Sequence, residues 1–340
     1  MQKNIETIAD FLARNQVNWR PHTKGIKIPA IAHKLLAAGA IGMTCSKLSE
    51  AEVMAFGGIK DILIASEIVG ITKINRLAHL RKHADVMVCV DDLDNAAEVS
   101  QVALEHGVVI RVLVELDTGM RRCGLKPGPA VVDFVLQILK LPGISFAGLM
   151  SWEGHTPKIE DPEEKRKSIE QSIQSLTDIA NQCREAGIPV KIVSCGGTGT
   201  FRTSATLPGV TEIEAGGGIF GDVTYRKWGS GLICTLFVLA TVISHPEPDR
   251  IVIDAGRKSM NFEYSIPQSV ELKSATFLKY SAEHSVLTID PAVDRVKIGD
   301  KLNFIVGYGD LTVCLHDQLY GVRNGLLEVR WDITGRGKIR

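Results

Sequence analysis

Residues 17–27 read VNWRPHTKGIK, a short strand-like segment that runs into a polar turn containing a glycine. Lys24 therefore falls at the carboxyl end of the predicted strand. A lysine that forms an imine needs a rigid position and a lowered ammonium pKa, and neighbouring cations such as Arg20, His22 and Lys27 lower it. A solvated basic turn at the surface explains the same residues, so this segment alone leaves both interpretations open.

Helices and strands alternate outward from this segment. The apolar spacing predicts helices at residues 2–15, 29–39, 49–56, 71–82, 94–106, 128–140, 161–186 and 200–207. It predicts strands at residues 17–20, 42–45, 61–65, 86–90, 108–116, 146–150, 190–193 and 210–214. These strands are rich in Val, Ile and Leu without strict alternation, as in a parallel sheet that is covered on both faces. The pattern predicts a TIM-type (β/α)8 barrel.

The character of the sequence changes after Gly216-Gly217-Gly218. Residues 232–340 contain β-branched and aromatic runs separated by turn signals, and no convincing helix. We therefore expect an α/β protein with two domains, a cofactor-binding barrel over residues 1–230 and a C-terminal all-β domain over residues 231–340.

Composition restricts the class of partner. The 340 residues carry a formal net charge of zero, whereas nucleic-acid and anionic-membrane partners favour a basic excess. No apolar run approaches the length of a membrane span, and the first residues do not resemble a signal peptide. The seven cysteines form no CxxC pair, which favours reduced thiols. The sequence thus predicts a cytoplasmic protein with a small-molecule substrate and neither nucleic-acid nor membrane partners.

Polar and glycine-rich segments follow four of the predicted strands, where a barrel of this kind gathers its functional side chains. They are residues 117–124, 152–155, 194–200 and 214–218. Each glycine cluster alone is also explained by a flexible turn, but loops after strands seven and eight are the usual place for a phosphate. Combined with Lys24, they indicate pyridoxal phosphate, with Lys24 for the imine, the two loops for the phosphate and Glu214 facing the ring nitrogen.

The segments RPHTKGIK, LDTGMRRCG, SWEGH, SCGGTGT and TVCLHDQLYGVR resemble the D-threonine aldolase and D-serine dehydratase family over essentially the whole chain. The family belongs to the alanine-racemase-like pyridoxal-phosphate enzymes, with a barrel followed by a β-domain. The resemblance implies that Lys24 forms the imine, with His22 among the cofactor-binding residues, and that Arg122 lies near the phenolic oxygen of the cofactor. It also implies a homodimer in which the β-domain of one subunit lies near the active site of the other. The phosphate-binding residues that it implies are Gly196, Gly197, Thr198, Gly199, Thr200, Gly216 and Gly217.

The sequence departs from the family pattern at three places. Ile26 replaces a second His after the lysine, and Trp152 replaces a commoner Tyr. The metal motif, normally His-x-Cys or His-x-Asp, reads Tyr308-Gly309-Asp310. Asp310 is then the only candidate metal ligand, and a phenol beside a carboxylate is a poor divalent site, so a metal is not favoured. The chain also starts within what resembles the first barrel helix, so either the natural start lies upstream or this branch is shortened.

These residues favour a lyase that acts on a D-β-hydroxy-α-amino acid. Asp310, beside Tyr308, is expected to take the hydroxyl proton as general base and so start retro-aldol cleavage, whereas dehydration needs a metal-activated hydroxyl. His155 is either a proton donor near the substrate or a structural loop residue. The alternatives are dehydration as in D-serine dehydratase, amino-acid racemisation, and a pyridoxal-phosphate carrier or regulatory protein without turnover.

Overall fold

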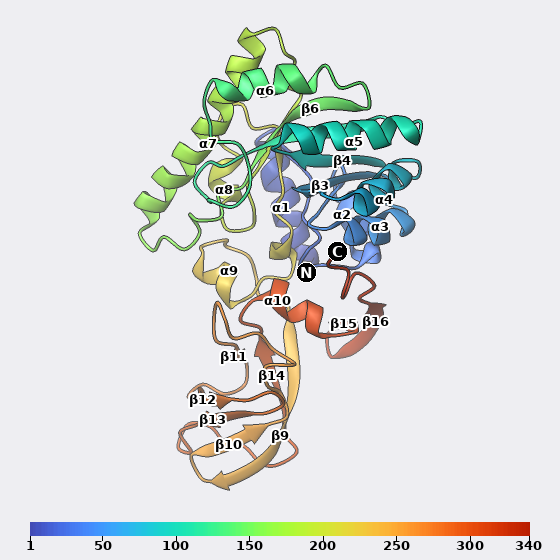
Figure 1. Cartoon of the computed structure of the whole chain (residues 1–340). Helices are drawn as coiled ribbons and strands as arrows, with labels where there is room; N and C mark the ends of the chain where they lie inside the picture. Colours follow the sequence, from blue (N-terminus) through green and yellow to red (C-terminus); the bar gives the residue numbers. More distant parts are fainter. The chain divides into compact units, whose positions relative to one another are not determined.

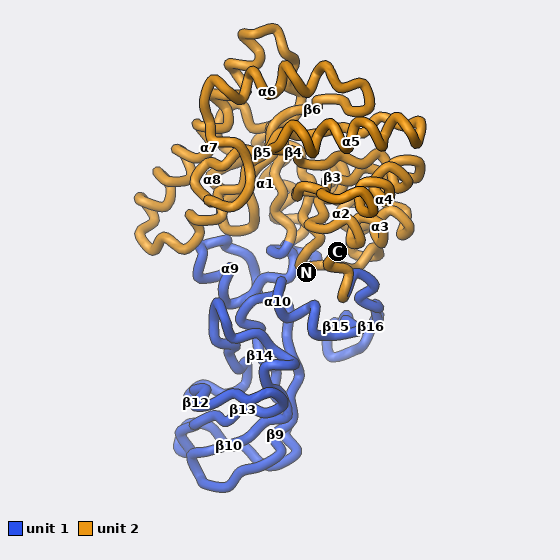
Figure 2. The backbone as a smooth tube through the Cα atoms, in the orientation of Figure 1, with its two compact units in different colours: residues 1–4, 217–336 blue, residues 5–216, 337–340 orange.

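The computed structural model describes residues 1–340, which form two compact units (Figure 2). The barrel unit comprises residues 5–216 and 337–340, and the C-terminal unit comprises residues 1–4 and 217–336. None of the helices combines the length and the apolar character that crossing a bilayer requires.

The barrel is built from eight strands that alternate with helices, as predicted. The strands are β1 (Asn18–Trp19), β2 (Met43–Cys45), β3 (Asp61–Glu67), β4 (Asp85–Val90), β5 (Ile110–Leu116), β6 (Ile144–Ser151), β7 (Ile192–Cys195) and β8 (Glu212–Ile213). The helices are α1 (Gln2–Arg14), α2 (Pro29–Ala37), α3 (Leu48–Phe56), α4 (Ile71–Arg81), α5 (Leu93–Glu105), α6 (Ala130–Ile138), α7 (Pro162–Glu185) and α8 (Phe201–Ser204). Figure 1 shows α3, α4, α5 and α6 on the outer face of the strands.

The sheet is parallel, and its strand order runs β1-β8-β7-β6-β5-β4-β3-β2. Its two edge strands meet, because the amide of Thr23 donates to the carbonyl of Thr44 at 2.7 Å and the amide of Thr44 to that of Pro21 at 2.9 Å. The interior is apolar, and six side chains from four neighbouring strands form one buried cluster: Leu63, Met87, Cys89, Leu113, Ala147 and Met150. Burying a side chain of Leu or Met size contributes about 1.5–3 kcal/mol, so these contacts fix the strands around the site.

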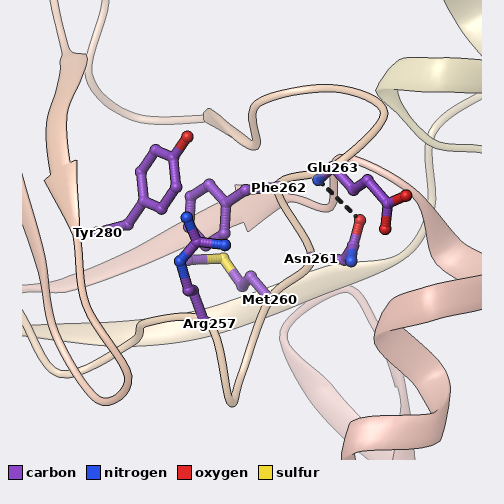
Figure 3. A pocket seen from close by; sticks show the side chains of 6 residues that line it. All are labelled: Arg257, Met260, Asn261, Phe262, Glu263 and Tyr280. Atoms are coloured by element: carbon purple, nitrogen blue, oxygen red, sulfur yellow. Dashed lines mark hydrogen bonds between the residues drawn. The ribbon is translucent and has the colours of Figure 1, made fainter.

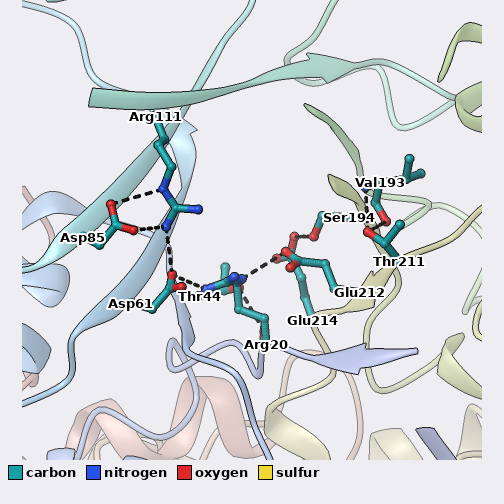
Figure 4. Close-up of polar contacts among 10 residues, drawn as sticks. All are labelled: Arg20, Thr44, Asp61, Asp85, Arg111, Val193, Ser194, Thr211, Glu212 and Glu214. Carbon is teal, nitrogen blue, oxygen red and sulfur yellow. Dashed lines mark hydrogen bonds and ion pairs between the residues drawn. The ribbon is translucent and has the colours of Figure 1, made fainter. Parts of the chain in front are cut away.

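An ionic network crosses the amino-terminal ends of the strands (Figure 4). Arg20 donates to Asp61 at 2.6 Å and to Glu212 at 3.0 Å, and its side chain is 2% exposed. Arg111 continues the network to Asp61 at 3.3 Å and to Asp85 at 2.7 Å. Such charges are tolerated inside a barrel only because each one is paired. The network lies at the end of the barrel that serves stability rather than chemistry.

The C-terminal unit contains an antiparallel sheet of six strands and a separate hairpin. The sheet follows the order β11-β14-β9-β10-β13-β12, and β15 pairs with β16. Its strands are β9 (Phe237–Glu247), β10 (Arg250–Ile253), β11 (Gln268–Ser269), β12 (Thr276–Tyr280), β13 (Ser285–Thr288), β14 (Lys301–Ile305), β15 (Gln318–Arg323) and β16 (Leu326–Asp332).

Short helices interrupt this β-rich unit. They are η1 (Gly217–Ile219), α9 (Val223–Lys227), α10 (Gly309–Thr312) and η2 (Val313–Leu315). The expectation that residues 232–340 contain no helix is therefore wrong. Asp222 stabilises the first turn of two of these helices. Its carboxylate accepts from the amide of Tyr225 in α9 at 2.6 Å and from the amide of Gly309 in α10 at 2.7 Å.

Candidate active site

Lys24 lies in a turn that directly follows β1, and buried polar contacts hold this turn on both sides. The hydroxyl of Thr23 donates to the carbonyl of Thr44 at 3.1 Å and also to Oε1 of Glu50. Lys27, with a φ of 57°, pairs through Nζ with Oε2 of Glu50 at 3.3 Å. Because Glu50 is fully buried, its contacts with Thr23 and Lys27 fix the backbone around Lys24, whose side chain remains half-buried.

The cationic surroundings expected for Lys24 are largely neutralised. Arg20 is bound to Glu212 and Asp61 at the opposite end of the barrel, and Lys27 is bound to Glu50. Burial lowers the pKa of His22 well below its usual value, and the nearby charges of Lys24, Lys27 and Arg122 lower it further. The ring of His22 is thus neutral, and its Nδ1 accepts from the amide of Lys24 at 3.3 Å.

The glycine-rich loop after β7 is a tight turn that leads into α8. Gly196 has a φ of 75°, a conformation that suits glycine. The amide of Gly197 donates to Oγ1 of Thr200 at 3.0 Å, and the amide of Thr200 returns a bond to the carbonyl of Gly197. The loop that follows β8 lies against the turn after β1, because a Cβ on Gly216 would stand 1.9 Å from the carbonyl oxygen of His22. The two predicted phosphate-binding loops of the barrel unit, at residues 196–200 and at Gly216, therefore have closely packed backbones.

Glu153 anchors the glycine-rich loop, and sequence reasoning gave it no role. Its buried carboxylate accepts from the amide of Gly196 at 3.2 Å and from the hydroxyl of Ser204 at 2.7 Å. One side chain thereby ties both ends of the loop and the short helix α8. The available signal was its place in the segment after the sixth strand, where an acid in an otherwise apolar setting indicates a specific partner.

Glu214 follows β8, with its carboxyl group buried. Its Oε1 accepts from the hydroxyl of Ser194 at 2.9 Å. Burial raises the pKa of Glu214 to about 8, although the bond from Ser194 and the charge of Lys24 both lower it. At neutral pH the group therefore carries its proton, and Lys24 lies close enough for its own charge to act on Glu214.

Trp152 and His155 lie in the loop after β6. The indole of Trp152 packs over Gly197, where a Cβ would approach its ring carbon to 2.5 Å. The imidazole of His155 packs against Gly119 in the same way, at 2.7 Å from a Cβ placed there. Nδ1 of His155 is buried without a hydrogen-bond partner within the protein. The loop thus brings the predicted site residue His155 next to the loop after β5, and Trp152 next to the loop after β7.

Arg122 lies after β5 and is held by an acid that sequence reasoning also missed. Its Nη2 stands 3.4 Å from Oε1 of Glu115, while about half of the Arg122 side chain, 47%, remains exposed. Glu115 sits one residue before the end of β5, in the run VLVEL. A carboxylate near the end of a buried strand is itself a signal of function, because burial without a partner is costly.

Tyr308 and Asp310 come together in the C-terminal unit. The phenol of Tyr225 donates to Oδ1 of Asp310 at 3.1 Å, and that of Tyr308 donates to Oδ2 at 3.3 Å. Gly217 approaches the same carboxylate, because a Cβ on it would stand 2.5 Å from Oδ1. Tyr225 was not predicted, since nothing in its local sequence indicates a partner 85 residues away. No three His, Cys, Asp or Glu side chains lie together as a metal-binding group.

A separate hollow of about 500 Å³ lies in the C-terminal unit (Figure 3). The guanidinium of Arg257 covers the ring of Tyr280 at 4.7 Å, and Phe262 stacks on that ring at 4.2 Å. The hollow is lined by Arg257, Met260, Asn261, Phe262, Glu263 and Tyr280. None of the residues predicted to act in catalysis lines it.

Comparison with known proteins identifies relatives of the whole chain. Residues 1–224 match the model "Alanine racemase, N-terminal domain", and residues 235–322 match the model "Putative serine dehydratase domain". A D-threonine aldolase of Arthrobacter sp. is 36% identical over 99% of this chain and 90% of its own length. A D-threo-3-hydroxyaspartate dehydratase of Delftia sp. is 32% identical over 77% of this chain and 70% of its own length.

A solved structure agrees with these sequence matches. The crystal structure of a D-threonine aldolase from Filomicrobium marinum superposes with a TM-score of 0.96 at 32% identity, covering 100% of this chain and 94% of that one. The similarity therefore extends over the barrel and the β-domain alike.

Proposed function

We infer the function from family membership, because this chain belongs to the D-threonine aldolase and D-serine dehydratase family, whose barrel domain is also that of alanine racemases. It is a lyase that acts on D-β-hydroxy-α-amino acids. Its reaction is retro-aldol cleavage of the Cα–Cβ bond, which gives a small amino acid and an aldehyde. The observation that carries this conclusion is the full-length similarity to a D-threonine aldolase.

The residues at the carboxyl end of the barrel fit pyridoxal phosphate, the cofactor that the family implies. Two buried polar atoms there, Oγ of Ser151 and Nδ1 of His155, have no partner within the protein, as expected where a polar ligand belongs. Lys24 would hold the cofactor through an imine, and the loops at residues 196–200 and 216–217 would hold its phosphate. When bound, pyridoxal phosphate supplies an electron sink for the pair released from the broken bond.

Glu214 is the proposed partner of the ring nitrogen. Its carboxyl group holds a proton at neutral pH, so it can donate a hydrogen bond while Ser194 holds Oε1 in place. Donation to the nitrogen would strengthen the electron sink. The proposed contact thus uses a proton that the fold already places on this acid.

Asp310 is the proposed acceptor of the β-hydroxyl proton. Bonds from Tyr225 and Tyr308 fix the plane of its carboxylate. Transfer of the proton to Asp310 leaves the electron pair of the O–H bond to form the aldehyde carbonyl as the Cα–Cβ bond breaks. The carbon released as the amino acid then needs a proton, and His155 is the proposed donor.

Dehydration remains the second candidate, because the dehydratase of Delftia sp. is also a relative. The donor set at residues 308–310 favours cleavage instead, since a phenol beside a carboxylate gives a weak Lewis-acid site. A homodimer, with the β-domain of one subunit near the active site of the other, and a cytoplasmic location complete the proposal.

Product analysis tests the function directly. Holo-protein is incubated with D- and L-isomers of several β-hydroxy-α-amino acids, and glycine, aldehyde, ammonia, keto acid and the opposite enantiomer are each measured. The aldolase predicts aldehyde plus glycine from D-isomers alone. Ammonia plus keto acid as main products would establish the dehydratase, inverted substrate the racemase, and absence of all products a cofactor carrier.

A further inference from the structure

Two acidic side chains contact each other inside the barrel, at the ends of β3 and β5. Glu67 and Glu115 lie within hydrogen-bonding contact, and Glu115 is 2% exposed. Oε1 of Glu67 and Oε2 of Glu115 are both buried without a hydrogen-bond partner. Two ionised carboxylates in this arrangement would repel each other and would leave two buried acceptors unsatisfied, each at a cost of about 1–3 kcal/mol.

One proton removes both difficulties, because a protonated carboxyl donates to an ionised one and so satisfies an oxygen on each side. We propose that Glu67 and Glu115 hold a single proton between them at neutral pH and, as a pair with one negative charge, position Arg122. The other oxygen of Glu115 already faces Nη2 of Arg122 at 3.4 Å. The pair and the guanidinium together are then electrically neutral.

The groups around the pair support one shared proton. Burial and the charge of Glu67 raise the pKa of Glu115 to about 8, against the opposing effect of Arg122. Burial also raises the pKa of Cys123 to about 11 and that of Cys89 well above its usual value, so both thiols are neutral. The three further titratable groups in this region are all acids, so they add no positive charge: Asp91, Asp92 and Glu214.

Asp91 has its own partner and so does not compete for Arg122. Its carboxylate accepts from the amide of Gly124 at 2.8 Å. Arg122 is consequently the cation to which the pair responds. A fully protonated pair would hold the guanidinium weakly, and a doubly charged pair would draw it inward, so the shared proton sets its position.

This positioning role rests on the proposed function, in which Arg122 lies near the phenolic oxygen of the cofactor. Glu67 and Glu115 act through Arg122 and are positioning residues. Loss of the shared proton at higher pH adds a second negative charge behind the guanidinium. The absorbance of the bound cofactor should respond to that change, whereas a purely structural pair would not affect it.

The first test uses the full-length protein without cofactor. Infrared difference spectra between neutral and alkaline pH report protonated carboxyl groups that ionise. We expect a carboxyl band that both Glu67→Gln and Glu115→Gln remove, because an amide takes over donation and leaves the remaining acid ionised. Glu214→Gln and Asp222→Asn separate the contributions of the two other buried acids with raised pKa values. Glu105→Gln, on the exposed face of α5, is the matched control.

The second test titrates the absorbance of the holo-protein. The Glu214→Gln protein lacks the other acid that has a pKa of about 8 and is proposed to contact the cofactor, so its remaining spectral step near pH 8 should be lost when Glu67→Gln or Glu115→Gln is added. Persistence of the infrared band in either pair variant overturns the shared proton. Loss of the band with an unchanged absorbance step overturns the positioning of Arg122. If the protein binds no pyridoxal phosphate, the proposed function fails, while the infrared result still decides the pair.

Discussion

The hydroxyl of Ser194 on β7 donates a hydrogen bond of 2.9 Å to Oε1 of Glu214, immediately after β8. A donor to a carboxylate favours its ionised form, yet burial outweighs this bond and raises the pKa of Glu214 to about 8. The barrel therefore presents a neutral acid, oriented by a neighbouring strand, at the end where its chemistry is proposed to occur.

Replacing Ser194 by Ala should raise the pKa of Glu214 further, because the ionised form loses a hydrogen bond that the protonated form needs less. The measurement is the pH dependence of the glutamate carboxyl ¹³C shift in cofactor-free protein. Ser204→Ala, which removes a hydroxyl bound to Glu153 instead, is the control. A midpoint that stays in place or moves to lower pH contradicts this assignment.

Glu214→Gln should reduce lyase turnover by about 100-fold or more, the usual contribution of a positioned proton donor, while cofactor affinity changes much less. The amide keeps an oxygen for Ser194 and has the shape of the acid, so the substitution removes chiefly the labile proton. Turnover numbers and the dissociation constant of pyridoxal phosphate are measured on the same preparation. An unchanged turnover number would remove Glu214 from the mechanism.

Lys24→Ala should abolish the imine absorbance band, because Lys27, the other lysine of the turn after β1, is paired with Glu50. Borohydride reduction of wild type, followed by peptide mapping, should place the label on Lys24. Lys34→Ala, which changes an exposed lysine of α2, should leave the band intact. A label on a different lysine in the Lys24→Ala protein would disprove the assignment.

The sequence was sufficient for the barrel because local periodicity determines each strand and helix, and β5 illustrates this with seven residues of which only Arg111 is not buried. It also placed Lys24 and Glu214 after strands, where the structure has them, while their roles remain proposals. It missed Glu115, Glu153 and Tyr225, because their roles depend on partners from other elements. The surroundings of Lys24 were mistaken for the same reason, since Glu50 on α3 and Glu212 on β8 neutralise its neighbours.

Glu153→Gln should weaken cofactor binding by about 10-fold, because losing one charged acceptor costs about 1–3 kcal/mol and loosens the loop at Gly196. The side-chain amide of the glutamine keeps one oxygen as an acceptor. Its NH2 group then faces either the backbone N–H of Gly196 or the hydroxyl of Ser204, both of which donate to Glu153 in the wild type. Fluorescence titration with pyridoxal phosphate measures the change. Glu160→Gln, at an exposed position in the same loop, provides the control, and equal affinities for the two variants would contradict an anchoring role.

The cofactor-free protein should lose stability as pH rises from about 6.5 to about 8. Glu115 and Glu214 have pKa values raised to about 8 and Asp222 has one raised to about 7, so each folded group keeps a proton that the unfolded chain has released. The stability that these three groups contribute is fully present below the pKa that they have in the unfolded chain. It is lost as the pH rises through the pKa that they have in the folded protein. His22, with its lowered pKa, acts in the opposite direction only below about pH 6.5.

Urea unfolding followed by circular dichroism at several pH values measures this loss. Glu214→Gln should flatten the slope by at most about 1.4 kcal/mol per pH unit, the value for one proton. Glu105→Gln should keep the wild-type slope. Stability that increases over this interval would show that these acids are ionised in the folded protein.

Chelation should leave turnover unchanged, because the resemblance implies that Tyr308 replaces a histidine ligand, and both oxygens of Asp310 accept bonds from phenols. A divalent ion would have to displace those bonds and would gain only one strong ligand in return. Activity is measured after treatment with EDTA and again after adding manganese or zinc. The variant Tyr308→His restores the family pattern, so it should acquire metal-dependent turnover if this position governs metal use. Loss of wild-type activity on chelation, recovered by the added ion, would show that Asp310 recruits other ligands.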